Sequence, residues 1–408
     1  MVDRLDPTLH DWMNAPETRI VMAALNAPGG EARFVGGAVR NALLGESVQD
    51  VDIATTLTPD EASAALAQNA ITVVPTGIAH GTLTAVVNGR PFEVTSLRHD
   101  VSTDGRRATV AFTTDWAEDA ARRDFTMNAI YADVNGTIYD PTGGIADLKA
   151  GRVRFVGDAD TRIQEDYLRI LRLFRFYAWY GREKIDDAAL AAVHANRAGL
   201  NRLSGERLQK ELLRLLKAPN PLPALRMMEK AGVLAELLPV TANLERLSQL
   251  CQVAEKYALP RNPVLSLAAL LNSADEARAL ASRLKLSNAE RERLVDAASA
   301  EPGFAPDLTA TQIRKLLYRF GKDRFGDLLL LRWADRASDP AWKVLYEQAG
   351  AWTRPEFPVD GADVMDCGVA EGPGVGRMLS LLERWWVDED FQPGRDALLA
   401  KLAEMARR

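Results

Sequence analysis

The chain of 408 residues has little cysteine and little histidine. Its two cysteines, Cys251 and Cys367, lie far apart in the sequence, which excludes a disulfide framework and a structural zinc site. The four histidines have spacings that match no zinc-hydrolase motif. Any metal bound here should therefore be a hard cation held by carboxylate oxygen, such as Mg²⁺. The scarcity of cysteine also fits a reducing compartment, and we expect a cytoplasmic protein.

Long apolar segments are missing as well. The N-terminal stretch MVDRLDPTLHDWMNAPETRI carries acidic residues early and no continuous apolar run, so it predicts neither a signal peptide nor a membrane anchor. With 47% hydrophobic and 26% charged residues, the composition is that of an ordinary soluble globular protein. The length is sufficient for two or three domains, and we expect no membrane partner.

Negative charge dominates, but it is not evenly distributed. The whole chain has a net charge of −6, whereas residues 151–217 hold fourteen Lys and Arg residues against nine Asp and Glu residues, a local +5. A basic band in an acidic chain is typical of a local polyanion site. A solvated helical surface would have the same composition, so charge alone leaves both interpretations open.

Residue patterns divide the chain into a mixed N-terminal part and a helical remainder. In the first part, β-branched runs alternate with short helical patterns, and Asn88-Gly89 between two such runs predicts a hairpin. From about Glu165 onward, helical patterns follow one another to the C-terminus. We therefore expect an α+β protein with a mixed-sheet head followed by a long all-helical remainder.

A glycine turn and two aspartates lie close together in the predicted head. Gly36 and Gly37, in FVGGAVRNALLG, fall between a strand and a helix, where backbone N–H groups and the helix N-terminus can approach an anion. Arg40, in the first turn of that helix, could reach the same phosphates. Asp50 and Asp52 follow in QDVDIATT and would project from one face of a strand. Like charges held so close repel, so one carboxyl should resist ionisation.

Each of these features alone has an ordinary explanation, because tight glycine turns and solvated acidic loop ends are common. Together they complement one another, since a triphosphate at the glycine turn could be bridged to the carboxylates by Mg²⁺. In such a two-metal arrangement, one ion activates an attacking hydroxyl and the other neutralises the pyrophosphate leaving group. This hypothesis makes Asp50 and Asp52 both metal ligands and catalytic residues.

On these residues, GGAVRNALLG followed by QDVDIATT resembles the first signature of the class II tRNA nucleotidyltransferase and poly(A) polymerase family, within the polymerase-β-like nucleotidyltransferase superfamily. Further segments resemble the family in the same order: PTGIAHGTLTAV, RRDFTMNAIYAD, DPTGGIADL, EDYLRILRLFRF and GADVMDCGVAEGPGVGRML. The resemblance implies a nucleotidyltransferase head with a mixed sheet at residues 1–150, a helical neck at residues 151–225, and a helical body and tail at residues 226–408. It also implies Mg²⁺ as cofactor, and tRNA, CTP and ATP as partners. The activity it implies is template-independent addition of CCA to the tRNA 3′ end.

The segment RRDFTMNA contains candidate nucleotide-binding residues. Arg123 offers a bidentate fork to phosphate, while Asp124 and Asn128 could accept from and donate to ribose hydroxyls. A salt-bridged entry into a strand is the alternative interpretation. The order of the matching segments favours nucleotide binding.

The segment EDYLRILRLFRF predicts a helix that is apolar nearly all round, apart from one charged stripe. The stripe consists of Asp166, Arg169, Arg172 and Arg175. It would face a cleft or a partner, or it would form a ladder of surface salt bridges. The resemblance implies that Asp166 and Arg169 hydrogen-bond the base edge of CTP or ATP as a protein template, and that Arg172 and Arg175 help to hold the nucleotide.

Three positions need separate comment. The family usually has an aspartate after the arginine of the first signature, and this chain has Asn41, whose neutral amide can still hydrogen-bond locally. Glu93, on the second strand of the predicted hairpin, could be a third metal carboxylate or a salt-bridged strand residue. Residues 99–112 resemble the family's flexible loop, with Gly105-Arg106-Arg107 at its tip.

The closest alternative function is that of a bacterial poly(A) polymerase of the same family. Those enzymes usually carry a G-R-R-F-like element, and this chain has Gly89-Arg90-Pro91-Phe92 in its place. The proline replaces the second basic residue, and this difference favours CCA addition over polyadenylation. The motifs leave open the addition of CC only or of A only. An RNA-binding protein without catalysis would not need the aspartate pair. A fused phosphohydrolase domain is unsupported, because His194 has no His-Asp motif beside it.

Overall fold

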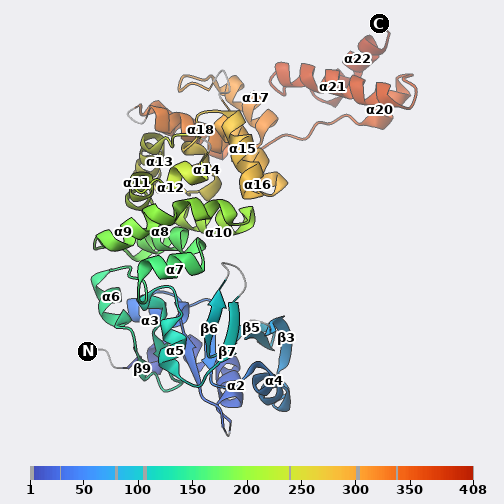
Figure 1. Cartoon of the computed structure of the whole chain (residues 1–408). Helices are drawn as coiled ribbons and strands as arrows, with labels where there is room; N and C mark the ends of the chain where they lie inside the picture. Colours follow the sequence, from blue (N-terminus) through green and yellow to red (C-terminus); the bar gives the residue numbers. More distant parts are fainter. Residues whose placement is uncertain are drawn as a thin grey trace. The chain divides into compact units, whose positions relative to one another are not determined.

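A computed structural model of the chain (Figure 1) has a mixed sheet in its first compact unit, Met1–Thr241, and helices in its second, Ala242–Arg408. The residues that the structure describes are 4–27, 29–78, 81–103, 108–238, 240–299, 304–336 and 339–407. Across these ranges no helix is both long and apolar enough to span a membrane. The predicted α+β fold, a mixed-sheet head followed by helical regions, is confirmed.

The head is built on a seven-stranded sheet with the strand order β3-β4-β5-β2-β1-β8-β9. Its strands are β1 (Ala32–Val35), β2 (Asp52–Thr55), β3 (Thr72–Gly77), β4 (Thr82–Val87), β5 (Arg90–Ser96), β8 (Tyr131–Ala132) and β9 (Ile138–Tyr139). Only β2 and β5 pair in parallel within this sheet, and its other neighbours are antiparallel. The predicted hairpin joins β4 and β5, and both Asn88 (φ 50°) and Gly89 (φ 77°) adopt positive φ at its turn.

Local sequence signals define the helices next to the central strands. α3 (Gly37–Leu44) follows β1 directly and ends at Gly45, which adopts the left-handed conformation with φ 71°. α4 (Pro59–Gln68) begins with a capping box between Thr58 and Glu61. The other helical elements of the head are η1 (Pro7–Leu9), α1 (Asp11–Asn14), α2 (Pro16–Leu25), α5 (Trp116–Ala121), η3 (Thr126–Asn128) and α6 (Gly144–Ala150).

The segment that resembles the family's flexible loop is largely strand. β6 (Arg98–Thr103) and β7 (Ala108–Phe112) pair antiparallel as a separate two-stranded sheet. The β-branched residues in both runs favour this pairing over an irregular loop. The predicted tip, Gly105-Arg106-Arg107, lies outside the described residues.

Helices follow the head within the first unit. They are α7 (Ala159–Glu165), α8 (Leu168–Tyr180), α9 (Asp187–Asn196), η4 (Arg197–Arg202), α10 (Gly205–Leu216), α11 (Leu222–Lys230) and α12 (Val233–Leu237). α8 packs against α10 and α11 and buries six apolar residues, as its sequence predicts.

The prediction that one helix covers the whole segment EDYLRILRLFRF is wrong. Asp166 has extended backbone between α7 and α8, and its carboxylate accepts a hydrogen bond from the Leu168 amide at 3.1 Å.

The second unit is helical in all of its secondary structure that the structure describes. Its helices are α13 (Leu244–Lys256), α14 (Pro263–Ala269), α15 (Ala274–Leu284), α16 (Asn288–Ala298), α17 (Ala310–Phe320), α18 (Lys322–Asp335), α19 (Ala341–Ala351), α20 (Gly361–Asp366), α21 (Pro373–Asp388) and α22 (Arg395–Ala406). The glycine-rich segment that resembles the family's tail forms the turn between α20 and α21, where Gly368 and Gly372 adopt positive φ.

Candidate active site

The glycine turn and Asp52 meet at the centre of the sheet. In the antiparallel pair of β1 and β2, Val35 lies opposite Asp52, so the turn at Gly36 follows directly beside that aspartate. Gly36 has φ 67°, and a Cβ added there would lie 3.7 Å from Asp52 Oδ2. On the other side of β2, Glu93 of β5 lies beside Asp52 in the parallel register. The strand before the glycine turn and the strand that begins at Asp52 are therefore neighbours in the sheet.

Asp50 reaches this region by a different route from the one predicted. β2 begins at Asp52, and Asp50 precedes it in a bend, exposed to solvent. Strand alternation therefore does not place the two side chains on one face. The bend nevertheless leaves Asp50 near enough for its negative charge to act on Asp52.

The pKa of the Asp52 carboxyl is raised to about 6. Burial is the largest cause, the charge of Glu93 adds to it, and the charge of Asp50 adds less. Arg123 and Arg40 act in the opposite direction and are outweighed. One aspartate thus resists ionisation, as the sequence predicts, but burial and Glu93 contribute more to this than its partner in the pair.

The chemistry of this group of carboxylates fits a hard divalent cation. Asp50, Asp52 and Glu93 form no hydrogen bond or ion pair through their carboxylates with any residue in the described ranges. No three His, Cys, Asp or Glu side chains of the described residues are placed to hold a metal together. Mg²⁺ is commonly held by one or two carboxylates with substrate phosphates and water completing its shell. The pair Asp50 and Asp52 meets that requirement, whereas Glu93 acts on Asp52 through its charge.

The raised pKa predicts that neutralising Asp52 stabilises the protein in a pH-dependent way. Native Asp52 holds its proton more tightly than a carboxyl at its ordinary pKa of 3.8. The cost of ionising it is therefore fully present above pH about 6 and is lost as the pH falls toward 3.8. We expect Asp52→Asn to raise the free energy of unfolding at pH 8 and to change it little at pH 4. Urea unfolding without divalent cations measures this, and an equal change at both pH values would contradict it.

Asp50 and Asp52, but not Glu93, line a cavity of about 840 Å³ in the first unit. Most of the predicted site residues line it too: Gly37, Arg40, Asp50, Asp52, Arg123, Asp124, Asn128, Arg172 and Arg175. These residues come from the glycine turn, α3, the bend before β2, β2 itself, the segment around η3, and α8. The cavity therefore joins the glycine turn, the carboxylate pair and several cationic side chains in one place.

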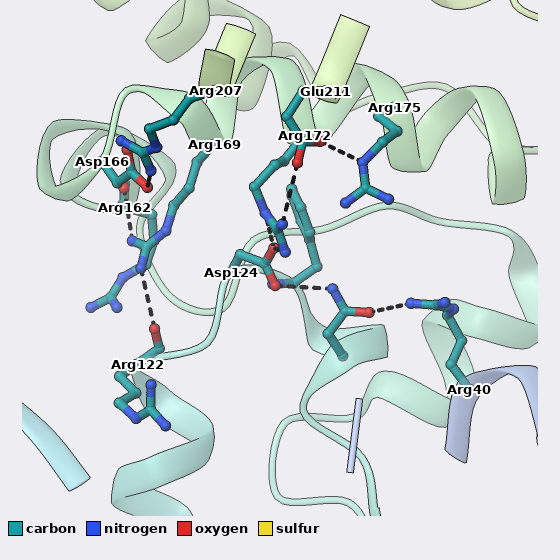
Figure 2. A network of polar contacts seen from close by, with 12 residues as sticks. Arg40, Arg122, Asp124, Arg162, Asp166, Arg169, Arg172, Arg175, Arg207 and Glu211 are labelled. Atoms are coloured by element: carbon teal, nitrogen blue, oxygen red, sulfur yellow. Dashed lines mark hydrogen bonds and ion pairs between the residues drawn. The ribbon is translucent and has the colours of Figure 1, made fainter. Parts of the chain in front are cut away.

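A chain of polar contacts runs along the cavity wall (Figure 2). Arg40 Nη1 donates to Asn128 Oδ1 at 2.7 Å, and Asn128 Nδ2 donates to Asp124 Oδ1 at 3.0 Å. Arg172 Nε donates to Asp124 Oδ2 at 2.7 Å. Burial alone would raise the pKa of Asp124, but the charge of Arg172 and the hydrogen bonds from Asn128 and Arg172 lower it to about 2. Asp124 is thus an ionised residue that holds Arg172 directly and Arg40 through Asn128.

Asn41 contributes to the same wall. Its Oδ1 accepts hydrogen bonds from Arg40 Nε at 3.2 Å and from Arg40 Nη2 at 2.9 Å. The guanidinium of Arg40 also lies over the rings of Phe176 and Tyr180, at 5.3 and 4.5 Å from their centroids. Burial lowers the pKa of Arg40. The neutral amide at position 41 thus positions Arg40 by hydrogen bonding instead of by charge.

Arg123 has most of its guanidinium engaged within the protein. Its Nη2 donates to Asp119 Oδ2 at 2.9 Å, and its Nε donates to the Tyr131 hydroxyl at 3.0 Å. Burial would lower the pKa of Arg123, but the charge of Asp119 raises it overall. Its Nη1 has no hydrogen bond to any residue that the structure describes. One edge of the guanidinium, and not the whole predicted fork, is therefore left to meet phosphate.

Asp166 and Arg169, which the resemblance assigns to the base edge, are not among the residues that line this cavity. Asp166 Oδ2 accepts from Arg207 Nη2 at 2.7 Å, while Arg169 pairs with Glu165 and donates to two main-chain carbonyls. Figure 2 shows this second cluster on the opposite side of Arg172 from the contacts of Arg40. The structure therefore divides the predicted nucleotide-binding residues between the cavity wall and a neighbouring polar cluster.

Comparison with known proteins shows which family the chain belongs to. Residues 32–154 match the model of the Poly A polymerase head domain, and residues 184–244 match that of the probable RNA and SrmB-binding site of polymerase A. The chain is 37% identical to CCA tRNA nucleotidyltransferase 1, mitochondrial, of Mus musculus, over 91% of this chain and 86% of the relative. It is 32% identical to the CCA-adding enzyme of Geobacillus thermodenitrificans, over 95% and 96%. The chain belongs to the class II CCA-adding enzyme and poly(A) polymerase family.

Solved structures of this family have the same fold. The Bacillus stearothermophilus CCA-adding enzyme in complex with CTP superimposes with a TM-score of 0.74 at 28% identity, over 96% of this chain and 97% of that one. The Thermotoga maritima CCA-adding enzyme complexed with tRNA superimposes with a TM-score of 0.66 at 21% identity, over 99% and 97%. The family resemblance of the sequence motifs therefore extends to the architecture of nearly the whole chain.

The motif comparison missed one buried acid in this member of the family. Glu211 on α10 is only 4% exposed and pairs with Arg175, and its other oxygen lies 3.7 Å from Arg172 Nη1. The signal in the sequence is a glutamate among the buried leucines of an amphipathic helix, next to Leu208 and Leu212. Such a buried acid requires a cationic partner, and α8 supplies two.

Loss of the Asp124 charge should destabilise the protein. Asp124→Asn leaves the Arg172 guanidinium without its main partner in a largely buried site, where an unpaired charge is costly. Because Arg172 is 30% exposed, we expect a loss of roughly 2 kcal/mol in the free energy of unfolding. Asp60→Asn, at an exposed acid in the first turn of α4, should change it by less than about 0.5 kcal/mol. Urea unfolding at pH 7 compares the two variants, and equal effects would refute the structural role of Asp124.

Proposed function

We propose that this chain is a template-independent nucleotidyltransferase that adds CCA to the 3′ end of tRNA from CTP and ATP and releases pyrophosphate. Relatives named for CCA addition, with 30 to 37% identity over more than nine tenths of this chain, support this function. The observation that carries it is the pair Asp50 and Asp52, whose carboxylates bond no residue that the structure describes. The pair lies beside the glycine turn, in one cavity with several cationic side chains.

The residues of the cavity have distinct tasks in this reaction. The terminal hydroxyl of tRNA attacks the α-phosphate of the nucleotide, and pyrophosphate leaves. Backbone N–H groups at Gly37 and the N-terminus of α3 bind phosphate oxygens. The free N–H edge of Arg123 adds a charged donor. Asp124 and Asn128 hold Arg172 and Arg40 in fixed positions, so their positive charges are already placed before the negative charge develops.

Asp50 and Asp52 would hold the metal. A divalent cation bound to them would neutralise charge on the leaving pyrophosphate and would lower the pKa of the attacking hydroxyl. We assign Mg²⁺ to this role, because carboxylate oxygens combined with substrate phosphates suit it better than any softer metal.

Asp166 and Arg169 read the base in this proposal, after they exchange their present partners. The ion pair between Asp166 and Arg207 joins side chains that are 28% and 33% exposed, and pairs that water reaches contribute little stability. Replacing Arg207 by the amino group of a base as the partner of Asp166 should therefore cost little free energy. The binding of CTP or ATP would supply the free energy for this exchange.

The extended product distinguishes CCA addition from its alternatives. Purified protein is incubated with tRNA that lacks its terminal CCA, Mg²⁺ and each nucleoside triphosphate, singly and in mixture. We expect extension by C with CTP alone and a completed CCA end with CTP and ATP together. Long A tracts would identify a poly(A) polymerase, and C alone or A alone would identify a partial enzyme. Absence of any extension would refute nucleotidyl transfer itself.

The parts of the chain divide the work in this proposal. Residues 1–150 act as the catalytic head, residues 151–225 as the neck that recognises the nucleotide, and residues 226–408 as the body and tail that bind tRNA. Duplex RNA would be held there by shape and phosphate contacts, because its deep major groove is closed to side chains. The relatives include a mouse protein named as mitochondrial and bacterial enzymes, so a cytoplasmic location stays a prediction for this chain.

A further inference from the structure

The active-site cavity contains an aromatic residue that the reaction scheme above does not use. Trp179, in the last turn of α8, lines the same cavity as Asp50 and Asp52, yet 39% of its surface is exposed. Its indole Nε1 donates to the main-chain carbonyl of Arg214 at 2.9 Å. The only polar group of the ring is therefore satisfied and its orientation is fixed. A large aromatic side chain held in this way at a cavity wall offers a flat apolar surface for stacking.

Unpaired positive charge lies on the adjoining helix. Arg214 and Lys217, at the C-terminal end of α10, line the cavity and are exposed, and neither forms an ion pair with a residue of the described ranges. The deeper Arg123, Arg172 and Arg175 are instead paired with acidic side chains. Phosphates can therefore approach Arg214 and Lys217 without breaking an existing ion pair. Aromatic stacking beside such cations is how proteins hold single-stranded nucleic acid.

We propose that Trp179 stacks against the terminal base of the tRNA acceptor strand, with Arg214 and Lys217 on the last phosphates. The 3′ hydroxyl of that nucleotide then faces the carboxylate pair in the same cavity. Trp179 is in this sense a positioning residue. The inference rests on the proposed function, since it requires that an RNA 3′ end be the acceptor.

The chemistry of repeated addition favours stacking at this position. The terminal base of the acceptor differs between the first addition and the later ones, because each added nucleotide becomes the next acceptor. A site that read hydrogen-bonding edges would reject some of these ends, whereas every base has a face that can stack. The residues assigned to base reading, Asp166 and Arg169, lie outside this cavity. The incoming base and the acceptor base would thus be recognised by different chemistry.

Fluorescence of 2-aminopurine tests the stacking directly. It is placed as the last base of a tRNA that lacks CCA, and its quenching is measured on binding to the full-length protein with CTP absent. We expect strong quenching by the parent and by Trp179→Phe, and loss of most of it with Trp179→Ala. With unmodified tRNA, Trp179→Ala should raise KM for tRNA roughly tenfold or more and change KM for CTP less than twofold. Equal quenching by parent and Trp179→Ala would overturn the inference.

The salt dependence of tRNA binding tests the phosphate contact proposed for Lys217. Lys217→Ala should reduce the slope of log K against log salt concentration by roughly 0.7 to 1, as expected for one lost phosphate contact. Lys149→Ala, at an exposed lysine of α6 that is not among the residues lining this cavity, is the matched control and should leave the slope unchanged. Equal slopes for parent and Lys217→Ala would contradict the phosphate contact.

Two further measurements separate the possible failures. If the parent extends no tRNA, the proposed function fails and the inference fails with it. If the parent adds CCA and Trp179→Ala matches it in quenching and in KM for tRNA, the inference alone is wrong. CTP binding by calorimetry should be the same in parent and Trp179→Ala. Loss of CTP binding would show that Trp179 acts on the nucleotide site, and would overturn the acceptor role.

Discussion

Asp52→Ala should lower the rate of nucleotide incorporation by roughly 10³-fold or more while leaving tRNA binding nearly unchanged. The expected size follows from the several kcal/mol of charge stabilisation that a bound metal supplies in the transition state. Asp52 has no hydrogen-bond or ion-pair partner among the described residues, so the substitution removes no contact that stabilises the fold. Single-turnover extension of tRNA lacking CCA measures the rate, and filter binding measures the affinity for tRNA.

Unfolding offers an internal control for this prediction. The pKa of Asp52 is raised by burial and by the charge of Glu93, so the variant should unfold at the same temperature as the parent or higher. A lower rate in a protein at least as stable cannot result from loss of the fold. Asp60→Ala, at an exposed acid of α4, should retain parental activity. Incorporation by Asp52→Ala within tenfold of the parent would contradict the catalytic role of Asp52.

Arg169→Ala should reduce the discrimination between CTP and ATP by roughly 10- to 100-fold, the size of one lost bidentate base contact. The guanidinium lies in the polar cluster beside the cavity, where it pairs with Glu165. The carboxylate pair and the glycine turn are not altered by the change. The rate with the preferred nucleotide at saturation should therefore fall much less than the selectivity does.

Arg162→Ala is the matched control, because Arg162 also pairs with Glu165, at 3.1 Å. Ratios of kcat/KM for CTP and ATP are compared in parent and variants, with one tRNA that ends before CCA and one that ends in CC. We expect Arg162→Ala to keep the parental ratios. Unchanged ratios in Arg169→Ala would remove Arg169 from the base-reading role and restrict it to its ion pair.

Local sequence signals predicted the framework of the site well. The turn at Gly36 and the hairpin at Asn88-Gly89 each depend on residues that tolerate or favour positive φ, and a few neighbouring residues determine them. The order of the family motifs then predicted the fold of nearly the whole chain.

The details that the sequence did not predict depend on contacts between distant residues. Glu211 lies 36 positions from Arg175, and periodicity alone does not show which helix supplies its partner. Asp166 leaves the predicted helix because its carboxylate bonds the Leu168 amide and Arg207, and both contacts compete with helical geometry. Asp50 lies in a bend, so strand alternation did not describe it. Which side chains pair in such a polar network depends on how the helices pack in the folded chain, and local sequence does not show this.

The central claim is that Asp50 and Asp52 hold divalent cations against a nucleoside triphosphate. A crystal of the protein soaked with Mn²⁺ in place of Mg²⁺, together with CTP, tests it most directly, because anomalous scattering locates the metal without assumptions about the site. The account predicts an anomalous peak within about 2.0 to 2.3 Å of oxygens of both carboxylates and of the CTP phosphates. A metal bound only to the phosphates, with both carboxylates directed into solvent, would contradict it.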